Sequence, residues 1–339
     1  MKKIRGFARL IAVFAVCLSL ASCKKNVDPS YTHMVGSTDF ELESFLPCSQ
    51  LIDLKATGVV SPEKFVVKWL IPKIYEDTLT GTHLTIRTPD EPCNLFVTVI
   101  TNAYGYYELT QSRTAVIIDP EESLTGRVFK GGLITDPRDG QQYHTTTVGD
   151  LEWFAENLKW GGAGICYDDC DVLQDLFGRL YTWNEATGGE DGFGLAGGPQ
   201  GACPEGWSVP TAEDWENLGE VLNKGVEVPF LSNWAGLGQK LTVEAFMNGE
   251  KLWPISPDNN KANTVNWNAL PAGYCMTSGD IFRDMRAYGM WWSSARRSSD
   301  RAYYRYIYFD ADYCGVNYAD VDDMAFSVRC VRLADGAGR

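Results

Sequence analysis

The sequence has little positive charge, only three histidines and no Cys-x-x-Cys pair. A formal net charge of -14 argues against a nucleic-acid partner, because binding to phosphates depends on clustered Lys and Arg. The histidines, His33, His83 and His144, all precede Leu151, so no convincing Ser-His-Asp set can be built with the C-terminal half. Because paired thiols at zinc spacing are also missing, we expect no metal site and no cofactor.

A basic start and a short apolar run identify an export signal at the beginning of the chain. The run from Leu10 to Leu20 follows four basic residues and is about half as long as a membrane-spanning helix. The phrase Leu20-Ala-Ser-Cys23 resembles the bacterial lipobox, which implies cleavage before Cys23 and lipidation of that residue. We therefore expect a lipoprotein signal peptide over residues 1–22 and a flexible tether over 23–38. Lys24 is not the Asp of inner-membrane retention, so we expect a lipid anchor in the outer membrane and a surface-exposed protein, with a periplasmic orientation left open.

The cysteine count indicates disulfides. Of ten cysteines, Cys17 lies in the leader and Cys23 is the lipid site, which leaves an even number in an exported chain. Zinc ligation is the competing interpretation. The candidates for disulfide formation are Cys48, Cys93, Cys166, Cys170, Cys203, Cys275, Cys314 and Cys330.

Residues 39–120 read as a small antiparallel β-sandwich. Short runs rich in β-branched and aromatic residues, such as 64–71 and 94–101, are separated by Gly, Pro, Asp and Asn turn signals. The phrase from Val97 to Gly105 looks like the penultimate strand and turn of immunoglobulin-like modules of the PKD type. Cys48 and Cys93 both fall inside this unit, so a bond between them is the economical pairing.

The rest of the chain carries phrases that occur in a fixed order. Thr211-Ala-Glu-Asp214 has the form of a helix start, Tyr181 to Ala186 can form a second helix, and 326–332 alternates as a terminal strand does. The phrases are Trp153-Phe-Ala-Glu-Asn-Leu158, Cys166-Tyr-Asp-Asp-Cys170, Gly178-Arg-Leu-Tyr-Thr-Trp-Asn-Glu-Ala186, Cys203-Pro-Glu-Gly-Trp-Ser-Val-Pro-Thr211, Leu270-Pro-Ala-Gly-Tyr274, Trp292-Ser-Ser294 and Phe326-Ser-Val-Arg-Cys-Val-Arg332. Together they resemble the Fibrobacter succinogenes major paralogous domain, a family similar to C-type-lectin-like and formylglycine-generating-enzyme-like folds. The resemblance implies an α+β fold class, with a C-type-lectin-like domain over 128–333 behind the immunoglobulin-like β-sandwich.

The resemblance also suggests disulfide pairs. In a C-type-lectin-like domain the last strand returns beside the start, which implies a bond between Cys203 and Cys330. A local Cys166–Cys170 loop would then leave Cys275 with Cys314. The connectivity itself stays open at this point.

Three activities are compatible with such a family. Similarity to formylglycine-generating enzymes implies a copper-dependent oxidase, but the chain has no Cys-x4-Cys pair in its C-terminal region, so we expect no enzyme. Calcium-dependent sugar binding would need a Trp-Asn-Asp phrase, which Asn266-Trp-Asn-Ala269 matches only in part. Reversible binding of a glycan or protein ligand is the expectation that remains.

From Ala262 to the end the chain contains no Lys, Glu or Gln, and Arg296 to Asp320 is dense in Tyr, Ser, Asp and Arg. This vocabulary is shared with antibody paratopes. The window resembles the variable segment of diversity-generating-retroelement target proteins, although a family habit of ending in Ser, Tyr and Asn would give the same composition. Alternate residues should be core. The expected ligand-binding residues are Arg296, Arg297, Ser299, Asp300, Tyr303, Tyr304, Tyr306, Tyr308, Asp310, Tyr313, Asn317 and Tyr318.

The sequence thus predicts a surface-anchored lipoprotein that recognises a glycan or protein on another surface. The alternative is a pilus-associated tip or structural subunit with fimbrial partners, in which the N-terminal sandwich docks onto a fibre. A formylglycine-generating-type oxidase comes third.

Overall fold

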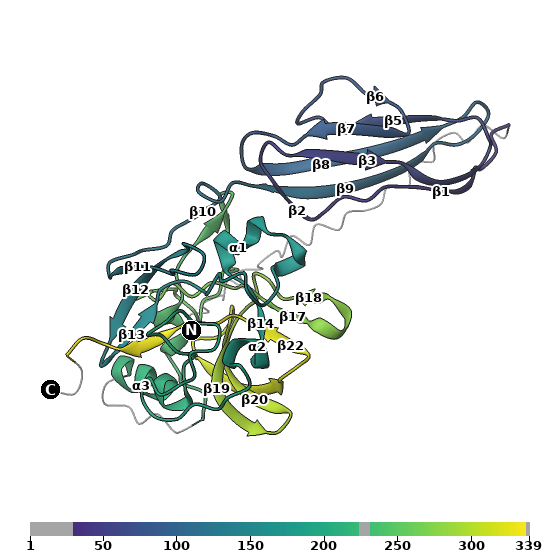
Figure 1. The fold of residues 1–339 in the computed structure, drawn as a ribbon. Helices are drawn as coiled ribbons and strands as arrows, with labels where there is room; N and C mark the ends of the chain where they lie inside the picture. Colours follow the sequence, from purple (N-terminus) through teal and green to yellow (C-terminus); the bar gives the residue numbers. More distant parts are fainter. Residues whose placement is uncertain (1–29, 224–230, 337–339) are drawn as a thin grey trace, which may run out of the picture.

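The computed structural model describes residues 30–223 and 231–336, which form an elongated β domain and a larger second domain (Figure 1). The predicted signal peptide, the lipidation site Cys23 and the first part of the tether lie outside these residues. About 40% of the described residues are strand and only 11% are helix. The expectation of an α+β, C-type-lectin-like fold class is therefore wrong, and the chain is closer to an all-β protein.

The N-terminal domain is a sandwich built on a five-stranded sheet in the order β2-β9-β8-β5-β6. A two-stranded β3-β7 sheet faces it, and β1 pairs with β4. The first strand begins at Val35, inside the segment expected to be tether. Alternate side chains of the long strands, such as Leu95, Val97 and Val99, are buried between the sheets, as the period of a strand requires. The strands are β1 (Val35–Asp39), β2 (Phe45–Pro47), β3 (Leu51–Lys55), β4 (Thr57–Ser61), β5 (Val66–Leu70), β6 (Leu79–Thr80), β7 (His83–Arg87), β8 (Cys93–Asn102) and β9 (Leu109–Ile118).

The second domain combines four small sheets, in the orders β10-β15-β16, β11-β12-β13-β23, β14-β22-β17-β18 and β19-β20-β21. Its longest strands, β19 and β20, form a hairpin, which is yellow-green in Figure 1. The strands are β10 (Leu124–Thr125), β11 (Leu133–Thr135), β12 (Gln142–Val148), β13 (Leu151–Phe154), β14 (Tyr181–Thr182), β15 (Phe246–Met247), β16 (Glu250–Lys251), β17 (Tyr274–Met276), β18 (Ile281–Arg283), β19 (Tyr288–Ser298), β20 (Arg301–Tyr308), β21 (Gly315–Asp320), β22 (Met324–Phe326) and β23 (Val331–Leu333).

The helices of this domain are short, which explains the error in fold class. They are α1 (Val172–Phe177), α2 (Trp183–Thr187), α3 (Ala212–Leu222) and α4 (Leu237–Leu241), with 3-10 turns at Tyr167–Asp169 and Thr277–Gly279. The predicted start at Thr211 is confirmed, because its side chain accepts from the Asp214 backbone N–H and the Asp214 carboxylate accepts from the Thr211 N–H. The second predicted helix is only α2, which ends where Gly188 takes a left-handed conformation.

The last strand is interrupted, and a buried arginine occupies the interruption. The expected strand over 326–332 is divided into β22 and β23. Between them the guanidinium of Arg329 lies 4.0 Å over the Trp267 ring and donates to the carbonyls of Phe154 and Asn268. A fully buried guanidinium is tolerated because backbone carbonyls satisfy its donors.

One of the four suggested disulfides is present. Cys203 and Cys330 are bonded with their Cα atoms 5.8 Å apart, which confirms that pair. The other six cysteines of the described chain are free thiols. The Cys275–Cys314 pairing is wrong because the two thiols belong to different cores, one beside Ala325 and the other beside Trp234.

The two shorter pairings are not formed either. Cys48 directly follows β2 and Cys93 begins β8, and β9 lies between these two strands in the sheet. The Cys166 thiol faces the Asp171 carboxylate at 3.5 Å, whereas the Cys170 thiol donates to the carbonyl of Phe45 at 3.4 Å. The thiols of Cys166 and Cys170 therefore contact different polar groups and not each other.

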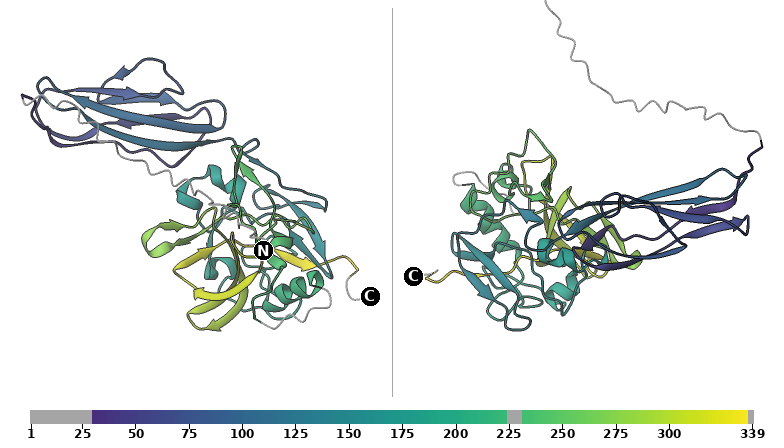
Figure 2. Two further views of the ribbon diagram at one scale, coloured as in Figure 1. Left: turned by 180° about the vertical axis from the view of Figure 1, so that it is seen from behind. Right: turned by 90° about the horizontal axis from the view of Figure 1, so that it is seen from above.

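The sandwich contacts the second domain at one end, beside α1 (Figure 2). Ile118 and Leu124 share an apolar cluster with Leu173 of α1, and Asn248 donates to the carbonyl of Ile117. The hairpin of β19 and β20 lies away from this junction (Figure 1). The junction therefore does not cover that hairpin.

Candidate functional site

An open pocket lined with aromatic side chains lies on one face of the β19-β20-β21 sheet. Its volume is about 280 Å³, at the small end for ligand sites, so it accommodates one group of a larger ligand. We call it the aromatic pocket; its lining residues are Tyr274, Asp284, Tyr288, Met290, Tyr304, Tyr306, Asn317, Met324 and Phe326. They come from β17, the β18–β19 turn, β19, β20, β21 and β22.

Strand alternation decides which tyrosines reach the pocket. Tyr304 and Tyr306 of β20 point to this face, where the Tyr304 ring lies 4.5 Å from Phe326 and the Tyr306 ring lies 6.1 Å from Tyr288. Their neighbour Arg305 points the other way, to a buried ion pair with Glu216 of α3. The expectation that alternate residues of the window are core holds for Arg305 and Ile307, whereas Tyr303 on the same face is only half-buried.

The other predicted ligand residues are divided between several places. Tyr308 stacks near Tyr288 at 4.6 Å and Tyr313 meets Tyr306 at 6.2 Å, so both border the aromatic pocket, and Asn317 lines it. Tyr303 pairs with Tyr318 across β20 and β21, on the opposite face from Tyr304.

The charged and small members of the prediction are mostly engaged with the protein itself. Arg296 lies 4.3 Å over the Trp183 ring and donates to the carbonyl of Gly189. Arg297 lies 3.9 Å over the Tyr318 ring. Ser299 and Asp300 occupy the exposed hairpin tip, and Asp310 accepts from the Ser256 hydroxyl at 2.8 Å. The structure therefore brings together five of the predicted residues around one pocket and leaves the others apart.

Several pocket residues were missed from the sequence. Tyr274, Asp284 and Tyr288 precede the window that its composition marks, and Phe326 follows it. One signal was available, because Tyr274 ends the phrase Leu270-Pro-Ala-Gly-Tyr274. Asp284 and Tyr288 carried no sequence signal, since only folding brings the β18–β19 turn beside β20.

The pocket has an acidic character. Asp284 is its one charged lining residue, and within residues 30–223 and 231–336 its carboxylate forms no ion pair. Burial raises the pKa of the Tyr304 hydroxyl to about 12. Burial and the charge of Asp284 raise the pKa of Tyr274, and burial, Tyr308 and Asp284 raise that of Tyr288. The phenols are therefore neutral donors at physiological pH.

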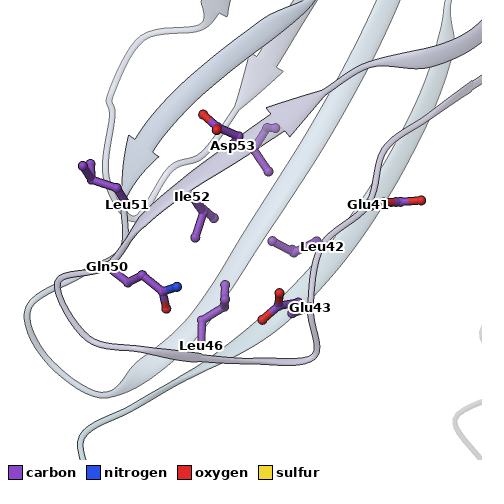
Figure 3. Close-up of a pocket in the computed structure, with 9 residues that line it drawn as sticks. Glu41, Leu42, Glu43, Leu46, Gln50, Leu51, Ile52 and Asp53 are labelled. Atoms are coloured by element: carbon purple, nitrogen blue, oxygen red, sulfur yellow. The ribbon is translucent and has the colours of Figure 1, made fainter. Parts of the chain in front are cut away.

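A second hollow of about 310 Å³ lies beside β3 in the N-terminal sandwich (Figure 3). Figure 3 shows Leu42, Leu46 and Ile52 around the gap between β3 and the segment before β2. Glu41, Glu43 and Asp53 add carboxylates at its edge. Among the strands of the described chain, β3 pairs only with β7, so one of its edges carries no strand.

Metal and membrane features were also sought in residues 30–223 and 231–336. No group of three or more His, Cys, Asp or Glu side chains in these segments could hold a metal ion. The same segments contain no helix with the length and apolarity needed to cross a bilayer.

The aromatic pocket lies inside the part of the chain that matches a known family. The model of the Fibrobacter succinogenes major domain matches residues 146–332, which is more than half of the chain and includes every residue of the pocket. No curated protein matches the chain. The matched region also contains the Cys203–Cys330 bond and the buried Arg329. The chain therefore belongs to the Fibrobacter succinogenes major domain family.

Proposed function

We propose that this protein is a surface-anchored lipoprotein that recognises a glycan or protein ligand through the aromatic pocket. The observation that carries the proposal is the convergence of Tyr274, Tyr288 and Tyr304 on one open pocket of the family domain. Tyrosine offers a large contact area and a hydroxyl at a low cost in side-chain entropy. Rings that are already packed on Phe326 lose little further freedom when a ligand binds.

Binding rather than catalysis fits the chemistry of this pocket. Its lining consists of aromatic rings, two methionines, an amide and one carboxylate. Such a set offers stacking surfaces and hydrogen bonds, whereas acid-base or nucleophilic catalysis calls for an activated pair in contact. A copper oxidase is the competing activity, and oxygen consumption on addition of Cu(I) and a thiol substrate would support it instead.

Recognition is tested with the chain from Lys24 onward, without lipid, on glycan and protein arrays. The variant Tyr304→Ala/Tyr306→Ala should lose every specific hit. The control Tyr303→Ala/Tyr318→Ala changes the same residue types on the opposite face and should keep the hits. Equal binding by the parent and the Tyr304→Ala/Tyr306→Ala variant would place the ligand site elsewhere.

The lipid anchor and the outer-membrane location belong to the same proposal. They are supported by the Leu20-Ala-Ser-Cys23 phrase and by Lys24 after it. Cells that express the chain should incorporate labelled palmitate into it, and Cys23→Ser should abolish labelling and release the protein from membranes. Protease added to intact cells distinguishes exposure at the surface from a periplasmic orientation.

The proposed diversification of residues 296–320 is tested by sequencing this segment across sibling isolates.

A pilus-associated role is favoured by the hollow beside β3. Leu51 is 59% exposed on this unpaired edge, and an extended partner segment can add to such an edge by backbone hydrogen bonds. Leu51→Lys should then remove the protein from sheared surface fibres without changing its amount in membranes. Val60→Lys is the control, since Val60 is 72% exposed on β4. Protein that stays with the fibres in both variants would exclude docking at β3.

A further inference from the structure

The aromatic pocket combines several aromatic rings with a single negative charge, and this combination narrows the chemistry of its ligand. The inference made here rests on the recognition function proposed above. The rings of Tyr274, Tyr288 and Tyr304 come from three strands, β17, β19 and β20, and all line the pocket. Phe326 connects two of these rings, with its own ring 6.2 Å from Tyr274 and 4.5 Å from Tyr304.

Asp284 is held at the rim by its own backbone. It has a left-handed φ of 61°, and its carbonyl accepts from the N–H groups of Ala287 and Tyr288. These bonds fix the turn that leads into β19, so the carboxylate is attached to a defined point beside the rings. No cation of the described chain pairs with it.

The nearby arginines leave the rim negative. Arg286 donates to the Glu250 carboxylate at 3.2 Å and to the carbonyl of Lys251. Arg283 lies opposite Tyr274 across β17 and β18 but does not line the pocket. The Asp284 carboxylate raises the pKa of both Tyr274 and Tyr288, and at Tyr274 this effect exceeds the lowering of the pKa by Arg283.

A site of this kind prefers one class of ligand group. The faces of aromatic rings attract cations, most strongly where the cation sheds water. A carboxylate beside the rings adds a Coulombic attraction, and it repels phosphates and uronic acids. We propose that the aromatic pocket binds an alkylammonium group, which contacts the rings of Tyr274, Tyr288 and Tyr304 with Asp284 as its counter-charge.

The test uses two probes of one shape and different charge, titrated against the lipid-free chain by NMR and calorimetry. Choline carries the ammonium group, and 3,3-dimethylbutan-1-ol is its neutral isostere. Choline should bind with a dissociation constant on the order of a millimolar, as expected for so few atoms. The isostere should bind at least about fivefold more weakly, since it has no cation–π attraction. Equal binding of the two probes, or no binding of choline, would overturn the proposal.

Charge variants give effects of opposite sign. Asp284→Asn should weaken choline binding about fivefold, whereas Arg283→Gln should strengthen it by a smaller factor. Asp280→Asn is the matched control, because Asp280 is also an aspartate with a left-handed backbone. It lies in the β17–β18 turn and does not line the pocket, so its replacement should change the affinity less than about twofold. Identical affinities for the Asp284 and Asp280 variants would contradict the assigned counter-charge.

Further probes identify the source of the ammonium group and separate this inference from the recognition function. Nα-acetyl-trimethyl-lysine represents a protein ligand and glucosamine an amino sugar; tighter binding of either one than of choline supports the proposal and names its source. Array hits that Tyr304→Ala/Tyr306→Ala abolishes, together with no binding of any ammonium probe, would leave recognition standing and reject the ammonium group. Binding of choline without any array hit would support the ammonium site and reject the proposed recognition of a glycan or protein.

Discussion

Arg305 and Glu216 form a buried ion pair that joins the tyrosine-rich hairpin to α3. Nη2 of Arg305 lies 2.8 Å from Oε1 of Glu216, and the guanidinium also lies 3.6 Å over the Trp234 ring. The same guanidinium donates to the carbonyl of Ser232 at 2.7 Å. The side chain between Tyr304 and Tyr306 therefore anchors β20 to the core, which holds the two tyrosines in place on the opposite face.

Replacement of Arg305 should be among the most destabilising changes in β20. Arg305→Ala leaves the Glu216 carboxylate buried without its partner, and such a loss costs about 3–5 kcal/mol. The free energy of unfolding, measured in urea, should fall by that amount. Arg301→Ala on the same strand is the control, since Arg301 is exposed and should change stability by less than about 0.5 kcal/mol. Equal losses in both variants would mean that the ion pair contributes little.

The carboxylate of Glu156 should make the free energy of unfolding depend on pH. Burial alone would raise its pKa. The hydrogen bond from the backbone N–H of His144 and the positive charges of Lys159 and Arg127 outweigh burial and lower the pKa below 4.5. The folded state then binds fewer protons than the unfolded state, so this contribution is present above pH 4.5 and is lost as the pH falls through the folded pKa. Glu156→Gln cannot titrate, so its deficit in unfolding free energy should be largest near neutral pH and shrink below about pH 4. A deficit that stays constant from pH 5 to about pH 3 would contradict this assignment.

The Cys203–Cys330 bond should contribute strongly to stability. It closes a loop with a sequence separation of 127 residues, and a long loop restricts the unfolded chain most. Cys203→Ala/Cys330→Ala should lower the free energy of unfolding by about 2–5 kcal/mol. The reductant dithiothreitol should lower the stability of the parent to that of the variant and leave the variant unchanged. A further loss in the reduced variant would reveal a second disulfide.

The ring and the hydroxyl of Tyr288 on β19 should make separate contributions to ligand binding. Tyr288→Phe keeps the ring in the aromatic pocket and removes only the hydroxyl, so binding should weaken by about fivefold or less, as for one neutral hydrogen bond. Tyr288→Leu removes the aromatic face as well and should weaken binding further. Titration of both variants with choline, alongside thermal unfolding, measures the two contributions. Unchanged choline affinity in Tyr288→Leu would exclude this ring from the site.

Local signals in the sequence were sufficient for several elements. The helix start at Thr211 depends on a hydrogen-bonding pattern among residues close in sequence, so its motif predicts it directly. The Cys203–Cys330 pair was implied by the C-type-lectin-like resemblance, and the structure contains that bond. The predicted fold class was wrong because it rested on the C-type-lectin-like resemblance, whereas the helices of the second domain are short and most of its regular structure is strand.

The sequence by itself determined the family, the tyrosine-rich composition of residues 296–320 and the strand alternation that places Tyr304 and Tyr306 on the face of β20 opposite Arg305. Only the tertiary structure decided which of these tyrosines share a pocket, because Tyr274, Asp284 and Phe326 reach it from other strands. It also decided that Arg305 is a core residue, since Glu216 and Trp234 meet it from α3 and from the segment before α4. Contacts between residues far apart in sequence have no local pattern, and they are formed only when the sheets pack together.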